Sequence, residues 1–252
     1  MKKLSRVLAA ACALGLMTFP TPSRAQEGIK VLADGPLRPA LIEIGEAFRR
    51  DTGRRVEFVF GPSPVIHKKV ADGEAADVLI IQPDFVAALI KSGKVVSGQH
   101  PVIGRVGIGL AGRADGPERD VGTTEAFRQV LLNADSLIFN TVASGNHFAT
   151  VLERLGIAES VKAKLVRLPP GAGAYERVIQ GKGNDLAVGT IPIIKVTKGV
   201  RLIGPLPPEF QSYLVYAAAP MNGAESPQTA TTFIAFLASP AARSLFVANG
   251  VE

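Results

Sequence analysis

Four turns rich in Gly, Pro and Ser contain the residue types in this sequence that could do chemistry. Each follows an apolar segment and precedes an amphipathic one, so it would expose backbone N–H groups at the start of a helix. Such helix starts hold an anion without a charged side chain, although any one of them alone could be an ordinary cap. The four turns are Asp34-Gly35-Pro36, Gly61-Pro62-Ser63-Pro64, Ser144-Gly145-Asn146 and Pro170-Gly171-Ala172-Gly173.

Other common kinds of site lack support in the sequence. The Gly107-x-Gly109-x-x-Gly112 spacing resembles a dinucleotide fingerprint, but a polar loop follows where a helix should begin. The three histidines are far apart, and the single Cys lies in the leader described below. No nucleophile elbow, P-loop or zincin motif occurs. The sequence therefore favours binding, and predicts no metal and no cofactor.

Short apolar runs alternate with amphipathic stretches, which is the pattern of an α/β protein with parallel strands. Leu37, Leu41, Ile44 and Phe48 recur at helical spacing, for example, and Gly53 would end that helix. The expected strands are 29–32, 56–60, 78–81, 136–139, 164–168, 186–191 and 213–219, with a longer apolar run at 102–111. The expected helices begin near Pro36 and cover 64–71, 85–92, 123–133, 146–155, 172–180, 227–237 and 241–249.

The first 25 residues have the composition of a cleavable export signal. Three basic residues flank the start of an apolar run from Val7 to Phe19, and Ser23-Arg24-Ala25 offers small residues where a signal peptidase cuts. We therefore predict cleavage after Ala25 and a location in the periplasm. The run is too short for a membrane-spanning helix, and Cys12 lies inside it, which disfavours a lipoprotein.

The net charge changes its meaning once the leader is removed. The complete chain has 28 basic and 22 acidic residues, and a formal charge of +6 would ordinarily suggest nucleic acid or a membrane surface as a partner. Four of the basic residues lie in the leader and no acidic one does, so the exported protein carries only +2. We therefore expect no nucleic-acid partner.

Three segments resemble the family of periplasmic molybdate-binding proteins. Val56–Asp84 (VEFVFGPSPVIHKKVADGEAADVLIIQPD) is similar to the family segment in which an F-x-S-S-x turn leads to a helix and then to G-x-x-A-D. Val142–Ile157 (VASGNHFATVLERLGI) resembles the third binding turn of the family and the helix after it. Gly204–Gln211 (GPLPPEFQ) resembles a subgroup described only as substrate-binding proteins. The similarity covers nearly the whole chain after the leader.

This resemblance implies the α/β fold of type II periplasmic binding proteins, with two lobes and two hinge-crossing segments. We expect lobe 1 to contain residues 26–107 and 215–252, and lobe 2 residues 108–214. Val102–Ala111 and Tyr213–Ala219 would be the crossings. The implied function is that of a monomer that closes on a small anion and delivers it to an ABC permease, because closure excludes water and strengthens each N–H contact.

The resemblance also places ligand-binding residues at the four turns. The first binding Ser of the family falls on Pro36, which has neither hydroxyl nor N–H, and the family's Tyr hydroxyl falls on Thr190. The identity of the anion therefore remains open: it could be an oxyanion such as molybdate or tungstate, or a small carboxylate. The residues expected to bind it at these turns are Gly35, Leu37, Ser63, Val65, Gly145 or Ser144, Ala172 and Thr190.

Two cationic side chains near the turns would favour a carboxylate. Arg38 lies in the first turn of the first expected helix and His67 in that of the second, and Arg can bind a carboxylate through two parallel hydrogen bonds. Solvent-facing side chains are the alternative for both, as they are for Lys68 and Lys69. Asp77 is expected to fix a loop rather than to bind the ligand.

An enzyme is the open alternative, because aconitate isomerase is similar to these binding proteins. Interconversion of cis- and trans-aconitate needs a base beside an acidic carbon and donors that stabilise the developing negative charge. His67 or Ser63, together with helix-start N–H groups, could supply both.

Overall fold

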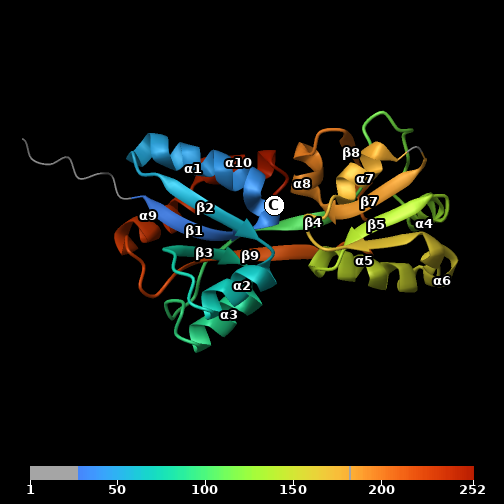
Figure 1. Ribbon diagram of the computed structural model, residues 1–252. Helices are drawn as coiled ribbons and strands as arrows, with labels where there is room; N and C mark the ends of the chain where they lie inside the picture. Colours follow the sequence, from blue (N-terminus) through green and yellow to red (C-terminus); the bar gives the residue numbers. More distant parts are fainter. Residues whose placement is uncertain (1–27, 182) are drawn as a thin grey trace, which may run out of the picture.

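The computed structural model describes residues 28–181 and 183–252, so the predicted leader and its cleavage site lie outside the described residues. The strands form one hydrogen-bonded path in the order β2-β1-β3-β9-β4-β7-β5-β6, with β8 paired to β4 beside it. Figure 1 shows them in two lobes that are joined in the middle by β4 (Val102–Arg113) and β9 (Tyr213–Pro220). This is the two-lobed α/β architecture that the sequence predicts.

Lobe 1 has a mostly parallel sheet that is covered by helices on both faces. Its strands are β1 (Ile29–Asp34), β2 (Val56–Gly61), β3 (Val78–Ile81) and the adjoining parts of β4 and β9. Along β1 the buried residues alternate between faces, so Val31 packs against one helix layer and Leu32 against the other. One layer consists of α1 (Arg38–Thr52), α9 (Pro227–Leu237) and α10 (Pro240–Ala248), and the other of α2 (Ser63–Ala71) and α3 (Pro83–Lys91).

Lobe 2 repeats this arrangement. Its strands are β5 (Ser136–Asn140), β6 (Leu165–Leu168), β7 (Asp185–Thr190), β8 (Val200–Pro205) and the rest of β4. Phe139 packs toward one helix layer and Ile138 toward the other. One layer consists of α4 (Thr124–Leu132), α5 (Ala143–Arg154) and α6 (Ala158–Val161), and the other of α7 (Ala174–Gln180) and α8 (Ile191–Val196). A short 3-10 turn, η2 (Lys162–Lys164), follows α6.

The strand β4 belongs to both lobes because it changes partners along its length. Its first part, up to Gly107, pairs with β9, whereas the part from Ile108 onward pairs with β7 and β8. This change supports the expected boundary at 107/108, and the complete division of the lobes at 107/108 and 214/215 stays a proposal.

The carboxyl ends of the parallel strands in both lobes point toward the middle of the molecule. β3 and β7 run antiparallel to the crossing strands, with Ile81 opposite Ala217 of β9 and Thr190 opposite Ile108 of β4. The turns that follow these strand ends therefore lie on the sides of the lobes that approach each other. In α/β sheets this edge is the usual place for a ligand.

Several element boundaries differ from the sequence-based expectation. A 3-10 turn, η1 (Gly35–Leu37), precedes α1, and α5 begins at Ala143, so Ser144 and Gly145 lie inside its first turn. α7 begins after Gly173, whose left-handed backbone (φ 78°) a helix cannot contain. The strand β8 was not expected, because Gly204 and Pro205 interrupt its apolar pattern.

No single helix within the described residues is long and apolar enough to cross a membrane. Among the helices of this described part, only α9 and α10 together reach that length and composition, and they meet at a bend of 63°. Both helices contribute residues such as Phe233 and Phe246 to the core of lobe 1.

Candidate functional site

The first two predicted turns meet around the carboxylate of Asp34. Asp34 ends β1 and is 4% exposed, and Ser63 opens α2 and is 1% exposed. Parallel pairing of β1 with β2 sets Asp34 opposite Gly61 and so brings the turns together. The Asp34 Oδ2 atom accepts hydrogen bonds from the backbone N–H of Ser63 (3.1 Å) and from its hydroxyl. The hydroxyl proton of Ser63, which was expected to reach the ligand, is therefore used within the protein.

Burial makes Asp34 easier to protonate than an ordinary carboxyl. Burial raises the pKa of Asp34 to about 6. The hydrogen bonds from Ser63 and from the N–H of Gly35 lower this pKa, but their effect is smaller than that of burial. The hydroxyl of Tyr216, on β9, is also buried and has no hydrogen-bond partner among the described residues. Burial and the nearby carboxylate of Asp34 both raise the pKa of Tyr216. Lobe 1 thus holds a buried hydroxyl without a hydrogen-bond partner, close to a buried carboxyl. Buried polar groups in native proteins nearly always have a hydrogen-bond partner, so this arrangement is unusual.

The third turn is organised by a neutral side chain, Asn140, at the end of β5. Its Oδ1 accepts hydrogen bonds from the N–H groups of Val142 (3.0 Å) and Gly145 (3.1 Å). These two donors fix the orientation of the amide, so Nδ2 donates to the Oγ of Ser144 (2.9 Å). Ser144 is 2% exposed, and its O–H has no acceptor within the described chain. Ser144 therefore keeps a free donor, whereas the N–H of Gly145 is already bonded.

The fourth turn and Thr190 lie in the same lobe. The N–H of Ala172 donates to the carbonyl of Pro169 (3.1 Å). Thr190 ends β7, is 7% exposed and forms no side-chain cap on α8. Tyr175 of α7 places its hydroxyl against Gly189, the residue before Thr190, and burial raises the pKa of Tyr175. A tyrosine hydroxyl therefore lies next to the position to which the family's tyrosine was assigned.

The cationic candidates and Val65 lie nearer the surface of lobe 1. Arg38 is exposed, with its guanidinium 4.6 Å from the centre of the Phe60 ring. Val65 is 48% exposed, in the first turn of α2. The half-buried ring of His67 lies 5.3 Å from the ring of Phe85, so it faces the neighbouring helix α3. These contacts are those of packed or solvent-facing side chains, and a role in ligand binding or catalysis stays a prediction.

The polar residues after His67 behave as expected. Lys68 forms an exposed ion pair with Asp72 (2.7 Å), and Lys69 is exposed. Asp77, which is 5% exposed, accepts hydrogen bonds from the N–H groups of Lys30 and Ser226, both at 2.8 Å. It therefore ties two segments together at the opposite end of the sheet from Asp34.

The structure gathers the predicted binding residues into two groups. Gly35, Leu37 and Ser63 lie at strand ends of lobe 1, and the buried side chain of Leu37 anchors its turn. The lobe 2 group joins the third and fourth turns, because β5 and β6 are paired with Asn140 opposite Leu168. α8, which follows Thr190, contacts η1 of lobe 1. The binding roles of both groups stay predictions.

Sequence reasoning missed the two side chains that organise the turns. Asp34 and Asn140 are each the polar last residue of a buried strand, at the end where ligand sites form, and this pattern could have identified both. Tyr175 and Tyr216 offered no comparable signal, because their hydroxyls acquire neighbours only through tertiary packing.

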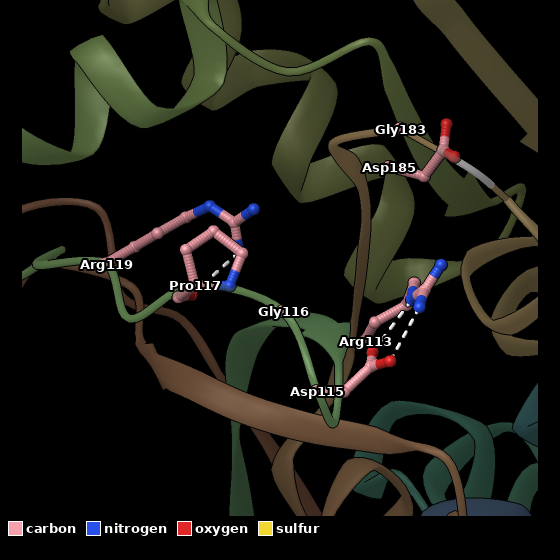
Figure 2. A pocket seen from close by; sticks show the side chains of 7 residues that line it. All are labelled: Arg113, Asp115, Gly116, Pro117, Arg119, Gly183 and Asp185. Carbon is pink, nitrogen blue, oxygen red and sulfur yellow. Dashed lines mark hydrogen bonds and ion pairs between the residues drawn. The ribbon is translucent and has the colours of Figure 1, made fainter.

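A separate cavity of about 220 Å³ lies at the outer end of lobe 2 (Figure 2). Arg113 binds Asp115 through two hydrogen bonds of 2.9 and 2.7 Å, and Arg119 donates to the carbonyl of Pro117 (3.3 Å) and to Asn184. Because protein groups already occupy these guanidinium groups, the cavity is a weaker candidate than the strand ends. Across residues 28–181 and 183–252 no group of three or more His, Cys, Asp or Glu is placed to hold a metal ion. The lining residues are Arg113, Asp115, Gly116, Pro117, Arg119, Gly183 and Asp185.

Two α/β lobes joined by two crossing strands, with buried polar side chains at the strand ends of each, define a type II periplasmic binding protein fold. Residues 29–252 match the family model described as bacterial extracellular solute-binding protein, and the chain belongs to that family. This confirms the fold and the kind of family that the sequence motifs predicted.

Individual relatives differ in what their names say they do. The chain is 26% identical over 250 residues to an aconitate isomerase from a Pseudomonas species, covering 95% of each protein. It is 25% identical over 205 residues to the molybdate-binding protein of Azotobacter vinelandii, covering 80% of this chain and 77% of that protein. The solved structure of a periplasmic molybdate-binding protein from A. vinelandii has a TM-score of 0.73 at 16% identity, covering 89% of this chain and 98% of that one.

Proposed function

We propose that this protein is an exported solute-binding protein that captures a small anion between its lobes and delivers it to an ABC importer. The observation that carries the proposal is the matching pair of buried serines, Ser63 and Ser144, at helix starts that follow strand ends in the two lobes. In this proposal the leader is cleaved after Ala25 and the protein works as a monomer in the periplasm.

Among anions, the proposal favours a small carboxylate over molybdate. A tetrahedral oxyanion needs several neutral donors around it, but Pro36 has no N–H. The donors of Ser63, Gly145 and Ala172 are bonded within the protein. A carboxylate makes fewer demands on each lobe, and a relative that matches over 95% of its length is named for a tricarboxylate.

A thermal-shift panel tests this proposal. Molybdate, tungstate, sulfate, succinate and trans-aconitate would each be added at saturating concentration, because a ligand that binds only the folded state raises the melting temperature. We expect a carboxylate to give the largest shift, and Ser144→Ala to reduce that shift, while the surface variant Lys68→Ala leaves it unchanged. If no anion raises the melting temperature, the small-anion function is wrong.

A second candidate, an isomerase of the aconitate type, is favoured by one specific observation beyond the named relative. The Asp34 carboxyl has a pKa raised to about 6, close to where a general base works best at neutral pH. Interconversion of cis- and trans-aconitate can be followed by ultraviolet absorbance. Turnover that is lost in Asp34→Asn or His67→Ala but kept in Lys68→Ala would replace the transport proposal, and absence of turnover with tight binding would exclude the enzyme.

A further inference from the structure

The donors and acceptors of lobe 1 do not suit an anion while Asp34 is ionised. The Ser63 hydroxyl donates a hydrogen bond to Asp34 and accepts one from the N–H of Gln82 (3.2 Å). It has no second proton to offer a ligand. The ionised carboxylate is itself a buried negative charge at the strand end where the proposed anion would bind, and like charges at a shared buried site oppose each other.

We propose that Asp34 couples anion capture to a proton, so that a ligand without a proton of its own binds lobe 1 together with one proton taken from solvent. This inference rests on the proposed function, because it concerns the same strand ends. It makes Asp34 a specificity-determining residue: the site favours an anion that arrives with a proton, and accepts a fully ionised one only at the cost of proton uptake.

The neighbours of Asp34 allow this exchange. The groups that act on it are the N–H and hydroxyl of Ser63 from α2 and the N–H of Gly35 from η1, and its carboxylate in turn acts on the hydroxyl of Tyr216 from β9. No Lys, Arg or His forms an ion pair with Asp34 in the part of the chain that the structure describes. Since no fixed cation holds the carboxylate in its ionised form, a second anion can shift it to the neutral form.

Protonation changes the direction of the hydrogen bond between the two side chains. Once a solvent proton sits on the Asp34 carboxyl, that carboxyl can donate to the Ser63 Oγ. The Ser63 O–H is then free to turn toward the ligand, in the role expected of the second binding Ser. The total is one proton gained by the protein and no bond broken other than hydrogen bonds.

Calorimetric titration tests the coupling with trans-aconitate and molybdate as probes, both fully ionised at neutral pH. For the probe that binds, we expect the affinity of the unaltered protein to fall about tenfold per pH unit above about pH 6.5. Titrations in buffers of different ionisation enthalpy should report about one proton taken up per anion. In Asp34→Asn, which keeps the shape but cannot ionise, the affinity should stay within about twofold across this range.

Asp77→Asn is the matched control, because Asp77 is equally buried but ties loops at the other end of the sheet, and it should keep the pH dependence of the unaltered protein. Binding that is independent of pH, with no proton uptake by the unaltered protein, would overturn the inference and leave the proposed function standing. So would an Asp34→Asn variant that retains the pH dependence. Failure of both probes and of the whole anion panel to bind at any pH would overturn the proposed function and this inference with it.

Discussion

The two lobes build the same kind of turn with side chains of nearly the same shape but different charge. In lobe 1 a strand ends in Asp34, whose carboxylate accepts from the N–H and hydroxyl of Ser63. In lobe 2 a strand ends in Asn140, whose amide donates to Ser144 and accepts from the N–H of Gly145. Replacing one oxygen by an NH₂ group therefore reverses the direction of the hydrogen bond to the serine.

This difference decides which half of the site is ready for an anion. The Ser144 hydroxyl is still available to donate a hydrogen bond to a ligand, whereas the Ser63 hydroxyl already donates its hydrogen bond to the carboxylate of Asp34. In the proposed mechanism, lobe 2 would therefore make the first contact with a fully ionised ligand, and lobe 1 would complete the site only after proton uptake. A proton requirement in one lobe alone is a means of selection that neutral donors in both lobes would lack.

The largest expected effect breaks the turn of lobe 2 and leaves that of lobe 1 intact. Gly145→Ala places a methyl group where the backbone carbonyl of Asn140 already lies. Because this carbonyl belongs to the backbone and not to a flexible side chain, it cannot easily move away. We expect a loss of about 3 kcal/mol in the free energy of unfolding, at the upper end for overpacking, measured by urea denaturation.

Gly35→Ala is the matched control in lobe 1. A side chain at Gly35 meets nothing within 4 Å, and Gly35 does not have a positive φ. Its stability should change by less than about 0.5 kcal/mol. A similar loss for both variants would mean that the two turns are equally tight.

The next effect concerns the contribution of one buried carboxyl, Asp34 of lobe 1, to the pH dependence of stability. The folded protein raises the pKa of Asp34 from 3.8 to about 6, so the folded state binds its proton more tightly than the unfolded state does. The stabilising contribution of Asp34 is therefore largest below about pH 4, falls as the pH rises to about 6, and is constant above, with a total loss of up to about 3 kcal/mol.

Urea denaturation at several pH values, with Asp34→Asn measured in parallel, isolates this contribution, since the amide cannot titrate. The difference in unfolding free energy between the two proteins should move steadily in favour of the variant as the pH rises through this window. A constant difference would show that burial does not perturb this carboxyl.

The sequence predicted most of the order of strands and helices because that order depends on local patterns, but it missed the short elements α6, α8 and β8. The start and end of α9 at Pro227 and Leu237 follow from an apolar stripe with proline at its first position. The roles of the site residues depend on contacts that no local pattern contains. Asp34 and Ser63 are 29 positions apart, and only the pairing of β1 with β2 makes them neighbours. The same pairing explains why Ser63 could be identified as important while the direction of its hydrogen bond could not.

The smallest expected effect on stability comes from Asn140→Asp, which would give the turn of lobe 2 the same carboxylate that the turn of lobe 1 has in Asp34. In Asn140→Asp the carboxylate can still accept from the N–H groups of Val142 and Gly145, and a negative charge at the start of α5 is favourable, so stability should change by less than about 1 kcal/mol. The amide donor to Ser144 is lost, however, and the Ser144 hydroxyl must turn to donate its own hydrogen bond to the new carboxylate.

Each lobe would then need a proton before it could hold a fully ionised anion. We expect affinity for trans-aconitate at neutral pH to fall about tenfold and the proton uptake measured by calorimetry to rise from about one to about two. Asn146→Asp adds the same charge in the first turn of α5, on an exposed side chain that contacts Arg167, and should leave the proton count at one. If Asn140→Asp also leaves the count at one, the amide of Asn140 does not control the Ser144 donor, and the contrast between the lobes lies in shape rather than in protons.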